Sequence, residues 1–476
     1  MARDEGGFVL VFYAICIPVL LGLVGLVIDG GRLMGLDAQT ASFADAAALA
    51  AAARLDRTPE AIPAARAAAL ALRNRPSFAE AGGNRLSFRF AARLSDLVNP
   101  SYSLPDRAGA EAVYVEATTA ETSLTGILLA LVGAQVVPVR RRAVAESQYY
   151  ACDVTPAVLC HPDPATFAAT ARPGRQYRLT MDGNRVAGSI ALLDRPGVAG
   201  DRQSLRDLAG DQPAFCYAEG VRLRTTVAPS EFDDALNVRF DRYQGRAGPV
   251  SPDLAVYPPA PNVIKGRAYE SCASPLNLYD TMPPFALPRD SAFYGLSPTG
   301  PWDKGTGDWR IAPALTGLGA GTALDEYLFW NHADKGTNVQ AHLRDAGTRW
   351  DLYLTELGLD PTREAVPVDT RGYAAAATMP TGGPFNSPAR ERAAPFCYAG
   401  THPMTAARRR ILYLSVADCD AFPGAATAMN LSRRVAKFFL TEPSNLGAVL
   451  AEFVGMLTPV RDDGKFRHVV QLVRTD

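Results

Sequence analysis

Six cysteines are the residues whose type and number most clearly indicate a chemistry. That chemistry is disulfide formation. The seventh, Cys16, lies in an apolar run near the N-terminus, so the rest of the chain holds Cys152, Cys160, Cys216, Cys272, Cys397 and Cys419. An even number of cysteines in one soluble region indicates a disulfide framework in an oxidising compartment. The alternative is a set of reduced thiols in the core of a cytosolic domain.

The pairing of these cysteines stays open, because six cysteines allow many connectivities. Proximity along the chain is the only guide. It pairs Cys152 with Cys160, Cys216 with Cys272, and Cys397 with Cys419. A zinc site is disfavoured, because the sequence has no C-x-x-C pair at finger spacing.

Two acidic residues next to tryptophans resemble the carboxylate pair of a carbohydrate cleft. In the segment WDKGTGDW, Asp303 and Asp308 each lie beside a tryptophan, Trp302 and Trp309. Paired carboxylates carry out glycoside hydrolysis. Carboxylates in a glycine-rich loop are, however, more often turn formers, and we favour that interpretation.

The histidines and arginines give no catalytic pattern. His332 and His342 lack the spacing that places two metal ligands on one helical face, so we expect loop or surface histidines. The basic triplet 408–410 precedes a predicted strand, which favours a solvated edge that discourages sheet pairing; docking of an acidic partner is the alternative. No nucleophile elbow, zinc-protease motif or phosphate loop is present. We therefore predict no enzyme and no catalytic, cofactor-binding or metal-binding residues. A site hidden in the loops of residues 201–345 is the alternative.

The chain that positions these residues is 476 residues long. This length predicts two or three domains. The composition, 48% hydrophobic and 20% charged, is that of a globular protein. A net charge of −1 provides no basic field, so we expect no nucleic-acid partner.

The strongest single element is an apolar run near the N-terminus. Residues Phe8 to Ile28 carry no charge over 21 positions, enough for a helix that crosses a hydrocarbon core of roughly 30 Å. Pro18 lies in the middle of this run, where a membrane helix tolerates it. A cleaved signal peptide is the main rival, but its apolar region would be shorter and would end at a cleavage site. We predict an uncleaved membrane anchor.

An alanine-rich segment, residues 29–75, follows the anchor and predicts a helical stalk. Leu36, Phe43 and Ala50 recur every seven residues and form a face suited to a partner helix. The alternative is a helix that lies on its own domain. Thr58 and Pro59 predict the N-cap and first residue of a second helix that ends near Arg73.

The remaining sequence predicts an α+β fold in two parts. Alternating apolar residues beginning at Leu86, Ala112 and Val137 predict strands of a small α+β unit over residues 76–150. The apolar stretch from Leu124 is too short to span a bilayer and predicts a core helix. Residues 151–476 predict a loop-rich α+β domain that contains the cysteines. Its last strands, expected near residues 411, 435, 448 and 468, would belong to one compact domain.

The sequence resembles the TadE/TadG-like pilus-assembly proteins of the bacterial tight-adherence (Tad, Flp pilus) system. The resemblance begins with a glycine, a long apolar run and LGLVGLVIDGGRLMGLDAQTASFADAAALAAAARLD, and it touches most of the chain. Further similar segments are VPVRRRAVAES, CDVTPAVLCHP, ALNVRFDRY, PWDKG, FWNH, RRRILYLSVADC, FFLTEP and EFVGM. Two family features are missing. Phe12 stands where prepilin processing usually has glutamate, and the D-x-S-x-S metal motif of the family's longest members is absent.

This resemblance implies a structural or assembly component of the cell envelope that acts by binding. Its expected location is the inner membrane, crossed once, with residues 1–7 in the cytoplasm and the bulk of the chain in the periplasm. Expected partners are membrane lipid and other Tad or Flp pilus proteins, such as pseudopilins, secretin or platform components. No cofactor and no small-molecule substrate is expected. The alternatives are a membrane-tethered periplasmic enzyme and a surface adhesin.

Overall fold

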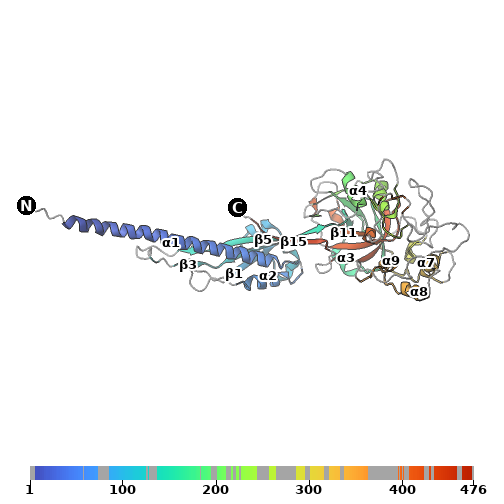
Figure 1. Ribbon diagram of the computed structural model, residues 1–476, viewed down its shortest axis with the longest axis horizontal. Helices are drawn as coiled ribbons and strands as arrows, with labels where there is room; N and C mark the ends of the chain where they lie inside the picture. The colour runs from blue at the N-terminus through green and yellow to red at the C-terminus, as the bar shows by residue number, and fades with distance from the viewer. Residues whose placement is uncertain are drawn as a thin grey trace, which may run out of the picture. The chain divides into compact units, whose positions relative to one another are not determined.

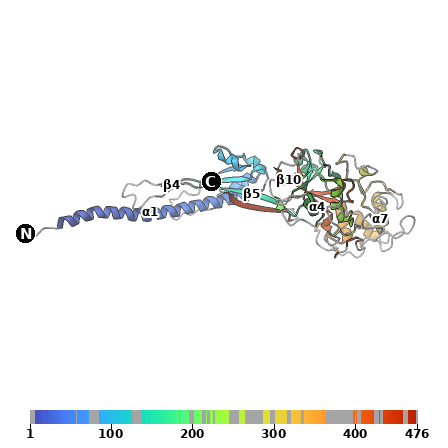
Figure 2. The same ribbon diagram turned by 90° about the horizontal axis from the view of Figure 1, so that it is seen from above.

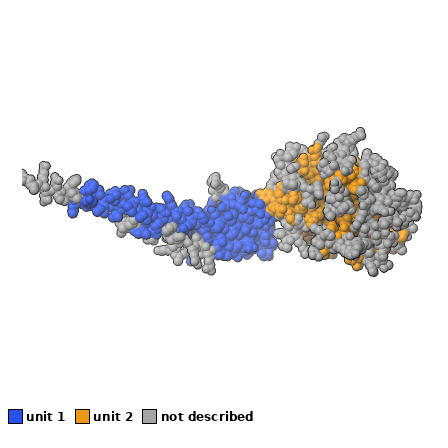
Figure 3. Space-filling model, viewed as in Figure 1, with its two compact units in different colours: residues 1–149, 468–476 blue, residues 150–467 orange. Residues whose placement is uncertain are grey.

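The chain folds into two compact units in the computed structural model (Figures 1 and 3). Unit 1 holds residues 1–149 and 468–476, and unit 2 holds residues 150–467. The structure describes residues 6–56, 58–72, 85–124, 127, 137–182, 184–194, 201–210, 216–217, 221–224, 227–243, 257–263, 286–294, 301–315, 321–332, 337–362, 395, 397–398, 400, 407–422, 428–429, 434–457 and 464–473.

Unit 1 begins with one long helix, α1 (Gly6–Ala52), which continues through Pro18. Its first half consists of uncharged apolar residues and its second half is rich in alanine, the best helix former, so no breaker ends it before Ala52. The predicted anchor and the first part of the predicted stalk are thus one continuous helix. The second helix, α2 (Ala61–Leu70), begins after Glu60 rather than at Pro59 and ends before Arg73.

The sheet of unit 1 has the strand order β1-β2-β5-β15. β1 (Leu86–Ala91) pairs antiparallel with β2 (Tyr114–Thr119), which pairs antiparallel with β5 (Arg142–Cys152). β15 (Phe466–Val473) lies beside β5. The strand expected near residue 468 therefore belongs to the sheet of unit 1 and not, as predicted, to the same domain as the strands near residues 411, 435 and 448. Two short 3₁₀ helices, η1 (Leu94–Val98) and η2 (Asp106–Glu111), connect β1 to β2.

Alanines of α1 pack against this sheet. Ala44, Ala47, Ala48, Ala51 and Ala52 are buried in one core with β1, β2, β5 and α2. Small side chains let the helix backbone approach the strands closely, which leaves this part of α1 on its own unit. The predicted alternative of a helix lying on its own domain therefore describes this half of α1.

A small hairpin completes unit 1. β3 (Thr122–Leu124) pairs antiparallel with β4 (Val137–Val139), and Leu124 and Val139 bury Leu36 of α1. The core helix expected from Leu124 lies outside the described residues, apart from Leu124 in β3 and Ile127.

Unit 2 is built on an eight-stranded sheet with the order β12-β10-β8-β6-β11-β13-β14-β7. The strands are β6 (Ala157–Cys160), β7 (Gln176–Thr180), β8 (Ile190–Leu193), β10 (Val221–Arg224), β11 (Ile411–Ala417), β12 (Ala428–Met429), β13 (Val435–Leu440) and β14 (Ala448–Met456). The pairings are antiparallel except for β6 beside β11, which is parallel. The short strand β9 (Cys216–Tyr217) pairs with the end of β5.

Helices cover both faces of this sheet (Figures 1 and 2). One core contains Leu412, Leu414 and Phe438 together with residues of α3 (Pro164–Thr170), α4 (Asp201–Ala209) and α5 (Pro229–Asn237). The opposite core contains Ile411 and Tyr413 together with residues of α7 (Ala323–His332), α8 (Thr337–Arg344) and α9 (Arg349–Leu357). Alternate residues of one strand enter opposite cores because strand side chains alternate in direction. The α+β class expected from the sequence is confirmed, as is the N-terminal apolar helix.

Short 3₁₀ helices connect several elements of unit 2. They are η4 (Val238–Phe240), η6 (Ser291–Phe293), η8 (Ala407–Arg410) and η9 (Cys419–Ala421).

Two disulfides follow the strand register. Cys152 lies directly opposite Cys216 in the β5–β9 pair, and these two cysteines are bonded. Cys160 ends β6 and bonds Cys419, which follows the parallel neighbour β11. The carboxyl ends of parallel strands meet at one edge of a sheet, which brings these two sulfurs together although 259 residues separate them.

The pairing that proximity favoured is therefore wrong for Cys152, Cys160, Cys216 and Cys419, because sheet register and not chain distance decides which sulfurs meet. Cys397 is also disulfide-bonded, and Cys272 lies outside the described residues.

Candidate functional site

The exposed apolar surface of α1 is the first candidate site. Among the described residues, α1 is the one helix with the length and composition to cross a membrane, and only 6% of its most apolar window is buried. Leu10 is 74% exposed and Val27 is 74% exposed. The predicted anchor residues Phe8, Pro18 and Ile28 all lie in α1. Side chains this apolar are unstable in water, so this surface requires a lipid or protein environment.

The predicted partner-helix face is covered by the chain itself. Leu36 is fully buried and Phe43 is 7% exposed, both inside unit 1, while Ala50 is only partly buried. Leu36 and Phe43 therefore cannot face a partner helix. The exposed side of the stalk is instead a row at every fourth residue: Met34, Ala38, Ser42 and Ala46. Periodicity found a helix face, but it did not decide which face the sheet would cover.

Asp29, directly after the apolar span, is buried with its charge compensated. Its side chain is 2% exposed and accepts hydrogen bonds from Arg32 Nη1 at 3.3 Å and from the Ile127 backbone N–H at 3.1 Å. This contact joins α1 to a residue 98 positions later. The one signal of this contact in the sequence is an aspartate three residues before an arginine, a spacing that favours an ion pair on a helix.

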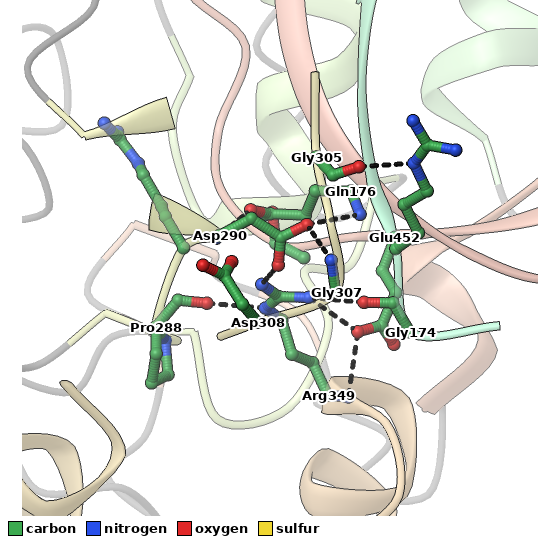
Figure 4. A network of polar contacts seen from close by, with 12 residues as sticks. Gly174, Gln176, Pro288, Asp290, Gly305, Gly307, Asp308, Arg349 and Glu452 are labelled. Carbon is green, nitrogen blue, oxygen red and sulfur yellow. Dashed lines mark hydrogen bonds and ion pairs between the residues drawn. The ribbon is translucent and has the colours of Figure 1, made fainter. Parts of the chain in front are cut away.

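A buried polar network in unit 2 is the second candidate site (Figure 4). Its centre is Arg349, the first residue of α9, where Thr348 forms a capping box with Asp351. The Arg349 guanidinium donates to Asp290 Oδ1 at 2.5 Å and to Glu452 Oε2 at 2.9 Å. It also donates to the carbonyl oxygens of Pro288 at 2.5 Å and Gly174 at 3.0 Å. Neither Arg349 nor its two carboxylates are exposed.

Glu452 of β14 holds the beginning of α9. Its carboxylate accepts the backbone N–H groups of Arg349 and Trp350, each at 3.0 Å, so a negative charge lies at the positive end of the helix dipole. Burial raises the pKa of Glu452, and the charge of Arg349 and the two N–H groups oppose this shift. Removing Arg349 would therefore raise the pKa of Glu452 further.

Asp290 connects three loops in the same network. It accepts the backbone N–H groups of Gln176 at 3.1 Å and Gly307 at 2.9 Å, and its own N–H donates to Gln176 Oε1 at 2.8 Å. A Cβ atom at Gly305 would lie 2.2 Å from the carbonyl oxygen of Gln176, so only glycine fits there. Every oxygen and nitrogen of this network is engaged within the protein, so the arrangement stabilises loops and offers no reacting group to a substrate.

The two aspartates of WDKGTGDW contact different parts of the protein. Asp308 accepts the backbone N–H and the hydroxyl of Ser291. Burial alone would raise the pKa of Asp308, but these hydrogen bonds lower it below its ordinary value. The Asp303 carbonyl accepts from Arg175. Asp308 therefore connects this loop to η6, and the turn-forming role that we favoured stays a prediction.

The two tryptophans of this segment are packing residues. Trp309 is 1% exposed, with the Arg349 guanidinium 5.2 Å from its ring centroid. Trp302 packs on Tyr177, with ring centroids 5.0 Å apart, and covers Gly188.

His332 is a core residue, which corrects the expectation of a loop or surface histidine. It is fully buried, with Nε2 2.9 Å from Glu356 Oε1, and the same oxygen accepts the hydroxyl of Tyr327. A carboxylate of α9 can hold a histidine of α7 because these helices pack in one core. His342 is exposed on α8. The two histidines share no site.

The basic triplet 408–410 is also not a solvated edge. Arg409 and Arg410 are each 1% exposed. Arg410 donates to the carbonyl oxygens of Leu440 and Thr441, and its guanidinium lies 4.5 Å from the Phe439 ring centroid. The prediction failed because guanidinium groups are stable inside proteins when carbonyl oxygens and aromatic faces surround them.

One serine–histidine pair occurs that no sequence motif indicated. In unit 1, Ser147 Oγ lies 2.9 Å from His468 Nε2 and 3.1 Å from the carbonyl oxygen of Leu55. The serine is fully buried. Its hydroxyl joins β5, β15 and the end of α1 and is not placed to attack a substrate. Within the described ranges, no group of His, Cys, Asp and Glu side chains could hold a metal ion.

Comparison with known families finds one match. Residues 6–54 match the model of the putative Flp pilus-assembly TadE/G-like family. This segment covers α1 and the two residues after it. No curated protein and no solved structure matches the chain.

Proposed function

From the TadE/G-like match of residues 6–54, we propose that this protein is a membrane-anchored component of a Tad-type Flp pilus assembly apparatus. α1 crosses the inner membrane once, with the N-terminus in the cytoplasm and the bulk of the chain in the periplasm. The protein acts by binding other pilus proteins, such as pseudopilins, secretin or platform components. No step of this role requires a catalytic group.

One observation carries the proposal. The segment that matches the family is the helix whose apolar side chains lie exposed from Leu10 to Ile28. The 21 uncharged residues from Phe8 to Ile28 form a helix roughly as long as the hydrocarbon core of a bilayer is thick. The disulfides support a periplasmic location for unit 2, because such bonds persist in oxidising compartments.

We expect the intact protein to stay in the membrane pellet during an alkaline carbonate wash. Arginines at Leu20 and Val24, which are 58% and 47% exposed on one side of α1, would remove it from that pellet. Each arginine near the centre of a membrane helix costs about 3 kcal/mol of insertion free energy. The control variant carries alanine at both positions and should remain in the pellet. Release of the wild-type protein by carbonate would contradict the anchor.

We also expect the exposed row of the stalk to contact pilus proteins. A photoreactive residue at Ala38, Ser42 or Ala46 should crosslink to another component of the apparatus in living cells. The matched control is Val98 on η1, which is 84% exposed but lies off the stalk. Equal capture from Val98 and from the row, or normal piliation in a strain that lacks the protein, would argue against the proposal. Appearance of the protein in the medium would favour a released adhesin.

A further inference from the structure

A pocket of about 360 Å³ lies in unit 1 where the end of the β3–β4 hairpin packs on α1. It is lined by Leu33, Met34, Asp37, Pro138, Val139, Arg140 and Arg141. The hairpin is fixed there because Leu36, on the same helix, is buried against Leu124 and Val139. The pocket is therefore a built feature of α1 and β4 and not a gap between mobile parts.

The height of this pocket above the apolar span can be calculated. At 1.5 Å per helical residue, Leu33 lies roughly 7 Å and Asp37 roughly 13 Å beyond Ile28. The polar headgroup layer extends roughly 5 to 7 Å from each side of the hydrocarbon core. A helix that crosses the bilayer with Phe8 to Ile28 thus brings the lower rim of the pocket to the level of the lipid headgroups.

The charges at the pocket are mainly basic. Arg141 Nε donates to Asp37 Oδ1 at 2.6 Å, and a second hydrogen bond joins the same two side chains. Arg140 is exposed and has no ion-pair partner among the residues that the structure describes. The nearby carboxylate of Asp29 is neutralised by Arg32 and the Ile127 N–H. One guanidinium is therefore available to an anion, and guanidinium binds phosphate oxygens in pairs.

Apolar side chains also line this pocket. Met34 is 76% exposed, and Pro138 is also exposed. Exposed apolar side chains beside an exposed arginine fit a ligand that has both an anionic group and hydrocarbon.

We propose that this pocket binds the phosphate headgroup of an anionic phospholipid, in the leaflet where α1 leaves the membrane. Arg140 contacts the phosphate, and Arg141 contributes when it turns from Asp37. The inference rests on the proposed function only in requiring that α1 spans the membrane. It adds a bound lipid that fixes the height and rotation of the stalk.

Native mass spectrometry of the full chain tests this inference, after reconstitution with phosphatidylcholine, phosphatidylglycerol or both and extraction in mild detergent. The wild-type protein should retain phosphatidylglycerol in preference to phosphatidylcholine. Arg140→Gln should weaken retention of phosphatidylglycerol about fivefold, the effect of about 1 kcal/mol per basic residue at an anionic membrane surface. Excess inorganic phosphate should not displace the lipid.

Asp37→Asn gives the opposite expectation, because loss of this carboxylate frees Arg141 and should strengthen retention of phosphatidylglycerol. The matched control is Arg107→Gln, which removes an exposed arginine of η2 in the same unit and should leave retention unchanged. The inference is overturned if Arg140→Gln and Arg107→Gln retain lipid alike, or if inorganic phosphate displaces the lipid.

The two failures can be distinguished. A wild-type chain that carbonate removes from membranes defeats the proposed function. A chain that stays in the membrane but retains both lipids equally defeats only the lipid site.

Discussion

Replacing Arg349 by methionine is expected to lower the free energy of unfolding of the protein by about 3 to 5 kcal/mol, because it leaves two buried carboxylates without their cation. Methionine keeps much of the side-chain volume, so the effect reports lost charge and hydrogen bonds and not a large cavity. Denaturant unfolding followed by tryptophan fluorescence measures the change, since Trp309 and Trp350 lie beside Arg349.

The matched control is Arg344→Met on α8. Arg344 also pairs with a carboxylate, that of Asp325 at 2.7 Å, but its side chain is 42% exposed. Exposed ion pairs contribute about 0 to 1 kcal/mol, so this variant should unfold almost as the wild type does. Similar losses in both variants would contradict the role assigned to the buried network.

The loss caused by Arg349→Met should also depend on pH. Burial already raises the pKa of Glu452, and removing Arg349 removes an interaction that opposes this rise. A group whose folded-state pKa is raised stabilises the fold below its unfolded-state pKa, and this contribution is lost as the pH rises through the folded-state pKa. The difference between variant and wild type should therefore grow as the pH rises above the ordinary pKa of a glutamate. The double variant Arg349→Met/Glu452→Gln should lack most of this growth.

Removing the Cys160–Cys419 disulfide is the second change with a large expected effect. In the chain-entropy account, a bond that closes a loop of 259 residues stabilises by about 5.5 kcal/mol, whereas one that closes 64 residues contributes about 4 kcal/mol. Cys160→Ala/Cys419→Ala should therefore destabilise unit 2 more than Cys152→Ala/Cys216→Ala does. Replacing both partners avoids an unpaired thiol.

Urea unfolding of both double variants, with the other disulfides kept oxidised, measures this order. Peptide mapping of the unreduced wild-type protein provides the control for the pairing itself. A larger loss for the Cys152–Cys216 variant would show that local strain or packing, and not loop length, determines the contribution. Recovery of a Cys152–Cys160 peptide would contradict the register of the sheet.

The sequence predicted local features of this fold well where a pattern depends on neighbours in the chain. The apolar run from Phe8 predicted α1, and alternating residues from Leu86 and Ile411 predicted β1 and β11. Features that depend on distant pairing were missed. Strand β15 joins β5 across the whole of unit 2, and Cys160 meets Cys419 through a parallel strand pair.

The burial of several polar side chains was also not predicted from the sequence. Arg349, Arg410 and His332 are charged or polar side chains that the sequence alone would place at the surface. Each is buried because carbonyl oxygens or carboxylates from other segments surround it. Such partners come from loops and strands far away in sequence, so residue type and spacing gave no signal for them. The same holds for the stalk. Its heptad pattern predicted a buried helix face but did not indicate whether a partner helix or the protein's own sheet would cover that face.

The position of β15 at the edge of β5 has a consequence for the order in which the protein is made. α1 and β5 emerge from the ribosome long before β15, because all of unit 2 lies between them in the sequence. During synthesis, β5 therefore keeps one side without its native neighbour until unit 2 has been made, and an open strand edge invites pairing with other chains. A chain that ends before β15 would present this open edge, so an incomplete molecule differs from a finished one by a strand that can pair with another chain.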